Sequence, residues 1–375
     1  MTVDETSWLT EEERLDWLQL IRSDNVGPTT FRALLARMGS AREALDALPS
    51  LANRGGADRR IHIASRDEAE AELKAADRLG IGLIGVNEPN YPPWLRQSDS
   101  APPLLGVLGS SECLAGPIIA IVGSRNASAA GRKMAAQLSR DLGEAGFVIA
   151  SGLARGIDTS AHQAALEAGT IAVFAGGLDS VYPPENRELA SEIVEHRGAA
   201  VSEMPVGWEP RARDFPRRNR IIAGLALATV VVEAAERSGS LITARMALEQ
   251  NREVMAVPGS PLDPRAAGAN RLLKQGAAIV TEADDVIRIL RPIMGEVPAA
   301  PRTVPVDVRE PVSLSDEPLD RERQQIVEAL GPSPMEVDEI VRLTGLPVQT
   351  VSISLLEMEL AGRLERHPGQ RVSLL

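Results

Sequence analysis

The sequence predicts an α/β fold: an extended Rossmann-like, doubly wound, mostly parallel sheet flanked by a small N-terminal helical domain and a C-terminal winged helix. Between residues 116 and 290, short β-branched runs alternate with helical patterns, which is typical of βαβ units. The runs are almost uniformly apolar, as expected for strands that helices cover on both faces. Behind a proline-rich stretch, three helical patterns and a strand-like end follow in the order of a winged helix.

The strands of the sheet are predicted from runs of apolar and β-branched residues. Seven runs are expected to form its main part: residues 118–122, 147–150, 171–174, 199–202, 229–232, 253–257 and 277–280. Two further runs, 81–86 and 104–108, are expected to extend one edge, with a proline-containing loop between them.

The chain divides into four predicted segments. Residues 1–75 form a helical domain, SAM-like or helix-hairpin-helix-like, and residues 76–292 hold the sheet. The turn at 25–30 (NVGPTT) either joins two helices of a plain bundle or offers backbone N–H groups to a phosphate. Six prolines between Arg291 and Pro318 predict a semi-rigid linker over 293–318. Residues 319–375 form the winged helix, with helices at 321–330, 336–344 and 348–361 and a strand-like end at 371–375.

Composition and charge exclude several classes of protein. With 44% hydrophobic and 25% charged residues, the 375-residue chain is globular rather than disordered. One cysteine permits no internal disulfide, and with four scattered histidines it provides no zinc-ligand spacing. No leader pattern and no run of ~18 apolar residues is present, so we expect a cytoplasmic protein without membrane contact. The net charge of −12 argues against a general polyanion binder, but not against a local basic groove.

Glycine- and serine-rich segments follow the predicted strands, where open α/β sheets bind ligands. Glycine lets the backbone approach an oxyanion closely, and the following helix starts carry partial positive charge. Each serine can either donate its hydroxyl to a ligand or cap a helix. Together the segments favour a phosphate-bearing ligand; they are residues 123–125 (GSR), 151–156 (SGLARG), 175–179 (AGGLD), Glu233 and 238–240 (SGS).

These loops match no cofactor motif. No G-x-G-x-x-G opens the first helix and no G-K-[ST] follows a strand, so we expect neither a nucleotide cofactor nor ATP-driven chemistry. Asp158, His162, Asp179 and Glu233 are the titratable candidates for catalysis, with Ser151 as a candidate nucleophile. The alternative interpretation is structural: Asp158 would be the N-cap of a helix over 159–168, and His162 would be a packing residue. A catalytic role therefore rests on analogy of fold.

A basic segment precedes one of the predicted helices. Residues 210–220 contain five arginines against one acid and include Phe215, one of four phenylalanines in the chain. The segment is expected to be a loop that leads into a helix over 218–226, with Pro216 near the first turn. Guanidinium groups beside an aromatic ring suit a sugar-phosphate backbone with exposed bases. The segment therefore indicates binding to single-stranded nucleic acid.

The ordered motifs resemble those of the DprA/Smf family of DNA processing proteins. The resemblance covers residues 81–290 in detail and the flanking segments in arrangement. It rests on VGSR at 122–125, SGLARGIDTSAH at 151–162, GGLD at 176–179, YP at 182–183, FPRRNRIIAG at 215–224, SGSLITA at 238–244 and AVPG at 256–259.

The resemblance implies a non-enzymatic cytoplasmic protein that binds single-stranded DNA with little sequence preference, protects it and loads the RecA recombinase onto it. The process would be natural transformation or recombination, and the protein would form a homodimer through the Rossmann-like domain. No cofactor and no metal are implied. At least one arginine of the 217–220 run is expected to fold inward. By resemblance, the DNA site would comprise Gly123, Ser124, Arg125, Phe215, Arg217, Arg218, Asn219 and Arg220. The loops after the strands and the basic segment add Ser151, Gly152, Arg155, Arg213, Gly239 and Ser240 to the predicted site.

Two further expectations concern the winged helix and a rival function. Residues 319–375 carry six basic against nine acidic residues, and the would-be recognition helix, 348–360, has no Arg or Lys. A major-groove reader needs such donors, so we expect protein interaction or autoregulation there rather than DNA binding. The rival function is a nucleotide or nucleoside-monophosphate hydrolase, in which Glu233 near Gly239 and Ser240 would act on a glycosidic bond.

Overall fold

The computed structural model describes residues 7–57, 60–294, 319–367 and 369–375. The chain forms two compact units, one of residues Met1–Ala71 with Arg302–Leu375 and the other of Glu72–Pro301. Each unit is described by itself below. The predicted linker at 293–318 lies almost entirely outside the described residues. No helix within the described ranges is long and apolar enough to cross a membrane.

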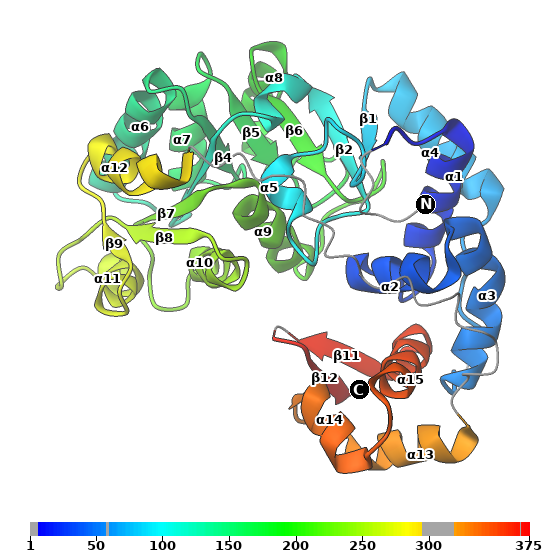
Figure 1. The fold of residues 1–375 in the computed structure, drawn as a ribbon. Coiled ribbons are helices and arrows are strands. Elements are labelled where there is room, and N and C mark those ends of the chain that lie inside the picture. Colours follow the sequence, from blue (N-terminus) through cyan, green and yellow to red (C-terminus); the bar gives the residue numbers. More distant parts are fainter. Residues whose placement is uncertain (1–6, 58–59, 295–318, 368) are drawn as a thin grey trace. The chain divides into compact units, whose positions relative to one another are not determined.

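The larger unit is built on one twisted sheet, as predicted (Figure 1). Within the described residues the sheet has nine strands in the order β1-β2-β6-β5-β4-β3-β7-β8-β9. The strands are β1 (Gly82–Gly85), β2 (Leu104–Gly109), β3 (Ile118–Gly123), β4 (Val148–Ser151), β5 (Thr170–Val173), β6 (Ala199–Ser202), β7 (Ala228–Val232), β8 (Glu253–Ala256) and β9 (Ala278–Ile279).

The direction of the strands fixes where a ligand can bind. From β6 to β9 all neighbours are parallel, whereas β1 and β2 form an antiparallel pair that joins β6 at one edge. The predicted edge extension is therefore confirmed. The chain builds outward from β3 to β6 and then returns to place β7 on the other side of β3. The carboxyl ends of β3 and β7 form the topological switch point, where such sheets leave a crevice.

Helices cover both faces of this sheet (Figure 1). Helices α6, α7, α8 and α12 lie on one face, and α9 and α10 on the other. A core of fully buried aliphatic side chains, such as Ile121, Leu138 and Val230, lies between the strands and α6, α7 and α12. The helices of the larger unit are α5 (Pro93–Arg96), η1 (Ser111–Leu114), α6 (Ala129–Glu144), α7 (Ile157–Ala165), η2 (Pro184–Asn186), α8 (Arg187–Glu195), α9 (Asp214–Leu225), α10 (Gly239–Glu249), η3 (Pro264–Ala266), α11 (Ala267–Lys274) and α12 (Ala283–Met294).

The smaller unit combines the N-terminal helices with the winged helix. Helices α1 (Glu11–Arg22), α2 (Pro28–Met38) and α3 (Ala41–Arg54) surround buried leucines, and the rings of Trp17 and Phe31 meet edge to face at 5.0 Å. Helix α4 (Arg66–Arg78) follows and contains the boundary between the two units, at Ala71 and Glu72. The winged helix consists of α13 (Asp320–Ala329), β10 (Met335–Glu336), α14 (Val337–Thr344), α15 (Val348–Leu360), β11 (Leu364–His367) and β12 (Arg371–Leu374), with β12 between β10 and β11.

Two predicted helix starts were wrong. Helix α9 begins at Asp214 rather than 218, because the buried Asp214 carboxylate accepts the Arg211 N–H at 2.9 Å and the Trp208 indole N–H at 3.0 Å. This local network starts the helix one turn early. Helix α7 is preceded by Gly156 at φ 80°, and Asp158 lies inside its first turn rather than at its N-cap.

Candidate functional site

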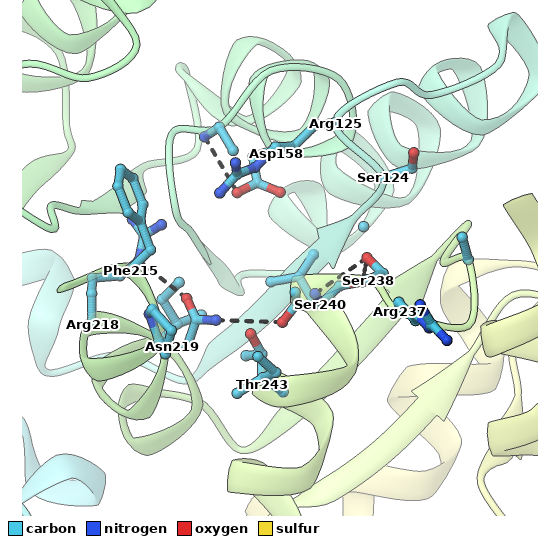
Figure 2. A pocket seen from close by; sticks show the side chains of 18 of the residues that line it. Ser124, Arg125, Asp158, Phe215, Arg218, Asn219, Arg237, Ser238, Ser240 and Thr243 are labelled. Atoms are coloured by element: carbon cyan, nitrogen blue, oxygen red, sulfur yellow. Dashed lines mark hydrogen bonds between the residues drawn. The ribbon is translucent and has the colours of Figure 1, made fainter. Parts of the chain in front are cut away.

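A pocket of about 810 Å³ opens at the switch point of the sheet, where the loops after β3 and β7 meet the start of α9 (Figure 2). Its walls contain polar, basic and aromatic side chains. The structure brings together eight of the residues predicted for the DNA site: Gly123, Ser124, Arg125, Phe215, Arg218, Asn219, Gly239 and Ser240. A smaller hollow of about 40 Å³ shares Arg125, Phe215 and Arg218 with it and adds Gly152 and Arg155.

The loop after β3 lies directly against its neighbours. A Cβ atom on Gly123 would lie 1.9 Å from the Val232 carbonyl oxygen, so only glycine allows β3 and β7 to close here. The Ser124 N–H donates to the Glu233 carbonyl oxygen at 2.7 Å, which ties this loop to the loop after β7. The close fit leaves the exposed Arg125 side chain at the mouth of the pocket.

Phe215 is the centre of an aromatic and basic cluster. The Arg125 guanidinium carbon lies 5.5 Å from the centroid of the Phe215 ring, within the range of a cation–π contact. Tyr182 meets Phe215 edge to face with ring centroids 5.3 Å apart, and its side chain is 51% exposed. The cluster therefore offers aromatic surface and a cation side by side at the pocket.

Arg218 is the arginine that folds inward. It is only 6% exposed, and its guanidinium donates to the Gly152 carbonyl oxygen at 2.7 Å and to the Val173 carbonyl oxygen. Burial lowers the pKa of Arg218 to about 10, against the opposing effect of Asp158. Asp158 accepts the Gly152 N–H at 3.1 Å, and burial raises its pKa while the Arg218 charge opposes that rise. Arg218 thus braces the loops after β4 and β5 against α9.

The other arginines of this run face different surroundings. Arg220 is held by Glu203 and by the Ser100 carbonyl oxygen, with 14% of its side chain exposed. Arg217 is exposed, and within the described residues no ion pair or hydrogen bond engages its guanidinium. Arg213 is also exposed, 4.0 Å from Asp214. Arg213, Arg217 and Arg220 do not line either hollow.

The start of α10 forms the opposite side of the pocket from Phe215 (Figure 2). Ser238 caps this helix, since its hydroxyl oxygen accepts the Ser240 N–H at 3.3 Å, and the two hydroxyl oxygens lie 2.7 Å apart. The Asn219 amide reaches across from α9 to the Gly239 carbonyl oxygen at 3.4 Å. The positive end of the α10 dipole therefore faces the pocket.

Ser151, at the end of β4, and Arg155, in the loop that follows, do not line the main pocket. The Ser151 hydroxyl is buried and donates to the Ile121 carbonyl oxygen at 2.6 Å, so it joins two strands rather than facing a ligand. Arg155 forms an exposed ion pair with Glu185 at the rim of the smaller hollow. An exposed pair of this kind contributes little to stability and leaves the guanidinium accessible.

The candidate catalytic groups are engaged in the fold. The Glu233 carboxylate accepts the Ser128 N–H at 2.9 Å and lies 3.2 Å from Arg265, with 9% of its side chain exposed. His162 is fully buried, and burial lowers its pKa to about 3. The Asp179 carboxylate accepts the Gly207 N–H at 2.8 Å. Over the described residues, no cluster of His, Cys, Asp or Glu has the arrangement of a metal site.

Several residues of the pocket were not assigned to the site from the sequence. Tyr182 and Thr243 lie within family-like motifs, yet the motifs alone do not show that they face the pocket. Arg237 was also missed, although it follows β7 and the rule on the carboxyl ends of strands would have included it. The contact between Tyr182 and Phe215 joins residues of two separate loops, and no sequence pattern predicts it.

The sheet, the pocket at its switch point and the two flanking domains define a Rossmann-type protein with an additional helical domain and a winged helix. Family models agree along the chain: residues 82–291 match DNA recombination-mediator protein A, residues 11–75 the DprA-like N-terminal HHH domain, and residues 310–370 the DprA winged helix domain. The chain belongs to the DprA/Smf family. The domain limits predicted from the sequence stay predictions.

Individual relatives agree with this membership. The chain is 39% identical to Protein Smf of Escherichia coli over 311 residues, 82% of each chain. The X-ray structure of DNA processing protein A from Streptococcus pneumoniae superposes with a TM-score of 0.62 at 34% identity, covering 75% of this chain and 98% of that one. The Helicobacter pylori protein, whose structure describes a single-stranded DNA binding mode, gives 0.52 at 27% identity over 57% and 96% of the two chains.

Proposed function

We propose that this chain binds single-stranded DNA with little sequence preference, with the pocket at the switch point as the binding site. The observation that carries the proposal is the exposed Arg125 guanidinium 5.5 Å from the Phe215 ring centroid, at the mouth of the pocket. A DNA strand with exposed bases needs a cation for phosphate and a ring for stacking. Duplex DNA keeps its base faces stacked internally, so the ring favours single strands.

The other walls of the pocket support the same ligand. The start of α10 and its serine hydroxyls suit a phosphate oxygen, and Tyr182 enlarges the aromatic surface beside Phe215. Arg217 and Arg213 extend the positive charge along the start of α9, outside the pocket itself. We expect these side chains to contact phosphates and base planes, so the binding should not depend on base identity.

The function is tested by the affinity for labelled oligothymidine over a range of salt concentrations. Arg125→Ala and Phe215→Ala should each weaken binding by ~1–3 kcal/mol, or about 5- to 150-fold. Arg125→Ala should also reduce the slope of log K against log[salt] by about 0.7, the value for one phosphate contact, whereas Phe215→Ala should leave this slope unchanged. Arg288→Ala, on α12 and paired with Asp285, is the control that should bind normally. Normal binding by both site variants would refute the proposal.

The further parts of the proposal follow the family resemblance. We propose that the protein protects the bound strand and loads RecA onto it, in transformation or recombination in the cytoplasm, and that it acts as a homodimer through the larger unit. Loading is measured as the rate at which RecA covers a single strand with and without the protein; an unchanged rate would remove this part. A molar mass from light scattering that equals the mass of one chain would refute the proposed homodimer.

The proposal treats the protein as a binding module rather than an enzyme. Glu233, the residue that the hydrolase alternative requires, holds the start of α6 through Ser128 and pairs with Arg265. It does not line the pocket. Release of free base from nucleoside monophosphates, abolished in Glu233→Gln, would instead establish the hydrolase.

A further inference from the structure

Helix α15 occupies the position of the recognition helix in the winged helix, yet it is buried on more than one face. Six consecutive residues, from Ile353 to Met358, are buried. Val351, Leu355 and Met358 belong to the core of the winged helix itself. Ile353, Leu356 and Leu360 lie on the opposite side of the helix, at 6%, 4% and 0% exposure. A recognition helix needs this outer face free to enter a major groove.

The N-terminal helical domain covers the outer face. A Cβ atom on Gly55, at the end of α3, would lie 1.9 Å from the Glu357 carbonyl oxygen, so the two backbones are in direct contact. The Asn25 amide donates to the Leu360 carbonyl oxygen at 2.9 Å. Arg363 donates to the Gly55 carbonyl oxygen at 3.3 Å. The 25–30 turn, one candidate for phosphate binding, thus holds the end of α15 through Asn25.

A buried charge fixes the register of this contact. The Glu357 side chain is 1% exposed and accepts two hydrogen bonds from the Arg323 guanidinium, at 2.7 and 3.2 Å. Arg54 of α3 forms an ion pair with the same carboxylate at 3.0 Å. A carboxylate removed from water needs such partners, and one of the two comes from the other domain. Docking therefore places a second guanidinium, that of Arg54, beside the buried Glu357 carboxylate.

We propose that α15 is a docking helix for the N-terminal helical domain of its own chain and does not read duplex DNA. The absence of Arg and Lys from residues 348–360 agrees with this role, because phosphates and base edges require donors. The two ends of the chain are thereby held together. The proposal concerns the smaller unit alone and does not depend on the proposed function.

Hydrogen exchange and duplex binding of the full-length protein test the proposal with Gly55→Val. The new side chain cannot fit against α15, so exchange over 353–360 should accelerate by about tenfold or more. Amides of the winged-helix core, such as Ile326 and Val372, should keep their protection. Gly331→Ala is the control, because nothing lies within 4 Å of a Cβ there. Duplex affinity should stay within about twofold of wild type, since residues 348–360 of the exposed helix carry no Arg or Lys.

A milder variant keeps the test decisive if Gly55→Val unfolds the whole winged helix. Arg54→Met removes the cation that α3 supplies to Glu357 and leaves Arg323 of the winged helix in place, so exchange should accelerate over 353–360 while the core stays protected. Unchanged exchange over 353–360 in both variants would overturn the docking role. A tenfold or larger gain of duplex affinity in either variant would show instead that docking shields a DNA-reading helix.

Discussion

Replacing Arg218 by methionine should destabilise the larger unit strongly, whereas the same change at Arg217 should not. Arg218 is 6% exposed and supplies hydrogen bonds to two carbonyl oxygens, those of Gly152 and Val173. Each carbonyl left without its donor costs about 1–3 kcal/mol. Loss of the Arg218 charge also removes the effect that opposes the rise of the Asp158 pKa caused by burial. With two carbonyl oxygens left without donors, we expect a loss of about 2–6 kcal/mol in the free energy of unfolding.

The measurement is urea unfolding, with hydrogen exchange of the β4 and β5 segments to assign the transition to the larger unit. Arg217→Met is the matched control, because it changes the neighbouring residue of the same helix and should alter the free energy of unfolding by no more than about 0.5 kcal/mol. A free energy of unfolding for Arg218→Met within about 1 kcal/mol of that of Arg217→Met would refute the brace.

The same pair of variants separates a brace from a phosphate ligand. If Arg217 contacts phosphate, Arg217→Met reduces the slope of log K against log[salt] for single-strand binding by about 0.7. Arg218 is buried and donates to the Gly152 and Val173 carbonyl oxygens. Arg218→Lys should therefore weaken binding by moving Phe215 and the 152–156 loop, without changing the slope of log K against log[salt]. A reduced salt dependence in Arg218→Lys would show that Arg218 contacts phosphate after all.

Three further outcomes are expected. Burial lowers the pKa of His162 to about 3, so below pH ~6.5 the unfolded chain binds a proton that the folded chain does not. The free energy of unfolding should therefore fall by about 1.4 kcal/mol for each pH unit as the pH is lowered from 6.5 to 3. In His162→Leu this fall should be shallower than in wild type, and equal slopes of unfolding free energy against pH would contradict the prediction. Gly123→Ala should destabilise by about 2 kcal/mol or more, because its Cβ would meet the Val232 carbonyl, whereas Gly239→Ala, with nothing within 4 Å, should be neutral in thermal melts. Deleting the residues beyond Pro318 should leave single-strand affinity nearly unchanged, and a tenfold loss would contradict the assignment of the DNA site to the larger unit.

The strands of the sheet and the position of the pocket could be predicted because both follow from local patterns. Apolar runs mark strands that helices cover on both faces, and short glycine-rich connections mark their carboxyl ends. The rule that ligands bind there brings Ser124, Arg125 and Ser240 together without coordinates. The limits of α7 and α9 were less predictable, since Gly156 and the buried Asp214 set them through contacts beyond the helix pattern.

The sequence by itself determined the class of the fold and the presence of arginines beside Phe215, because periodicity and composition are properties of neighbouring residues. Only the tertiary structure decided which arginine does what. Arg217, Arg218 and Arg220 project in different directions from one helix, so one meets solvent, one the buried carbonyls and one Glu203. The structure likewise decided that the outer face of α15 lies against α3, since that burial joins residues some three hundred positions apart.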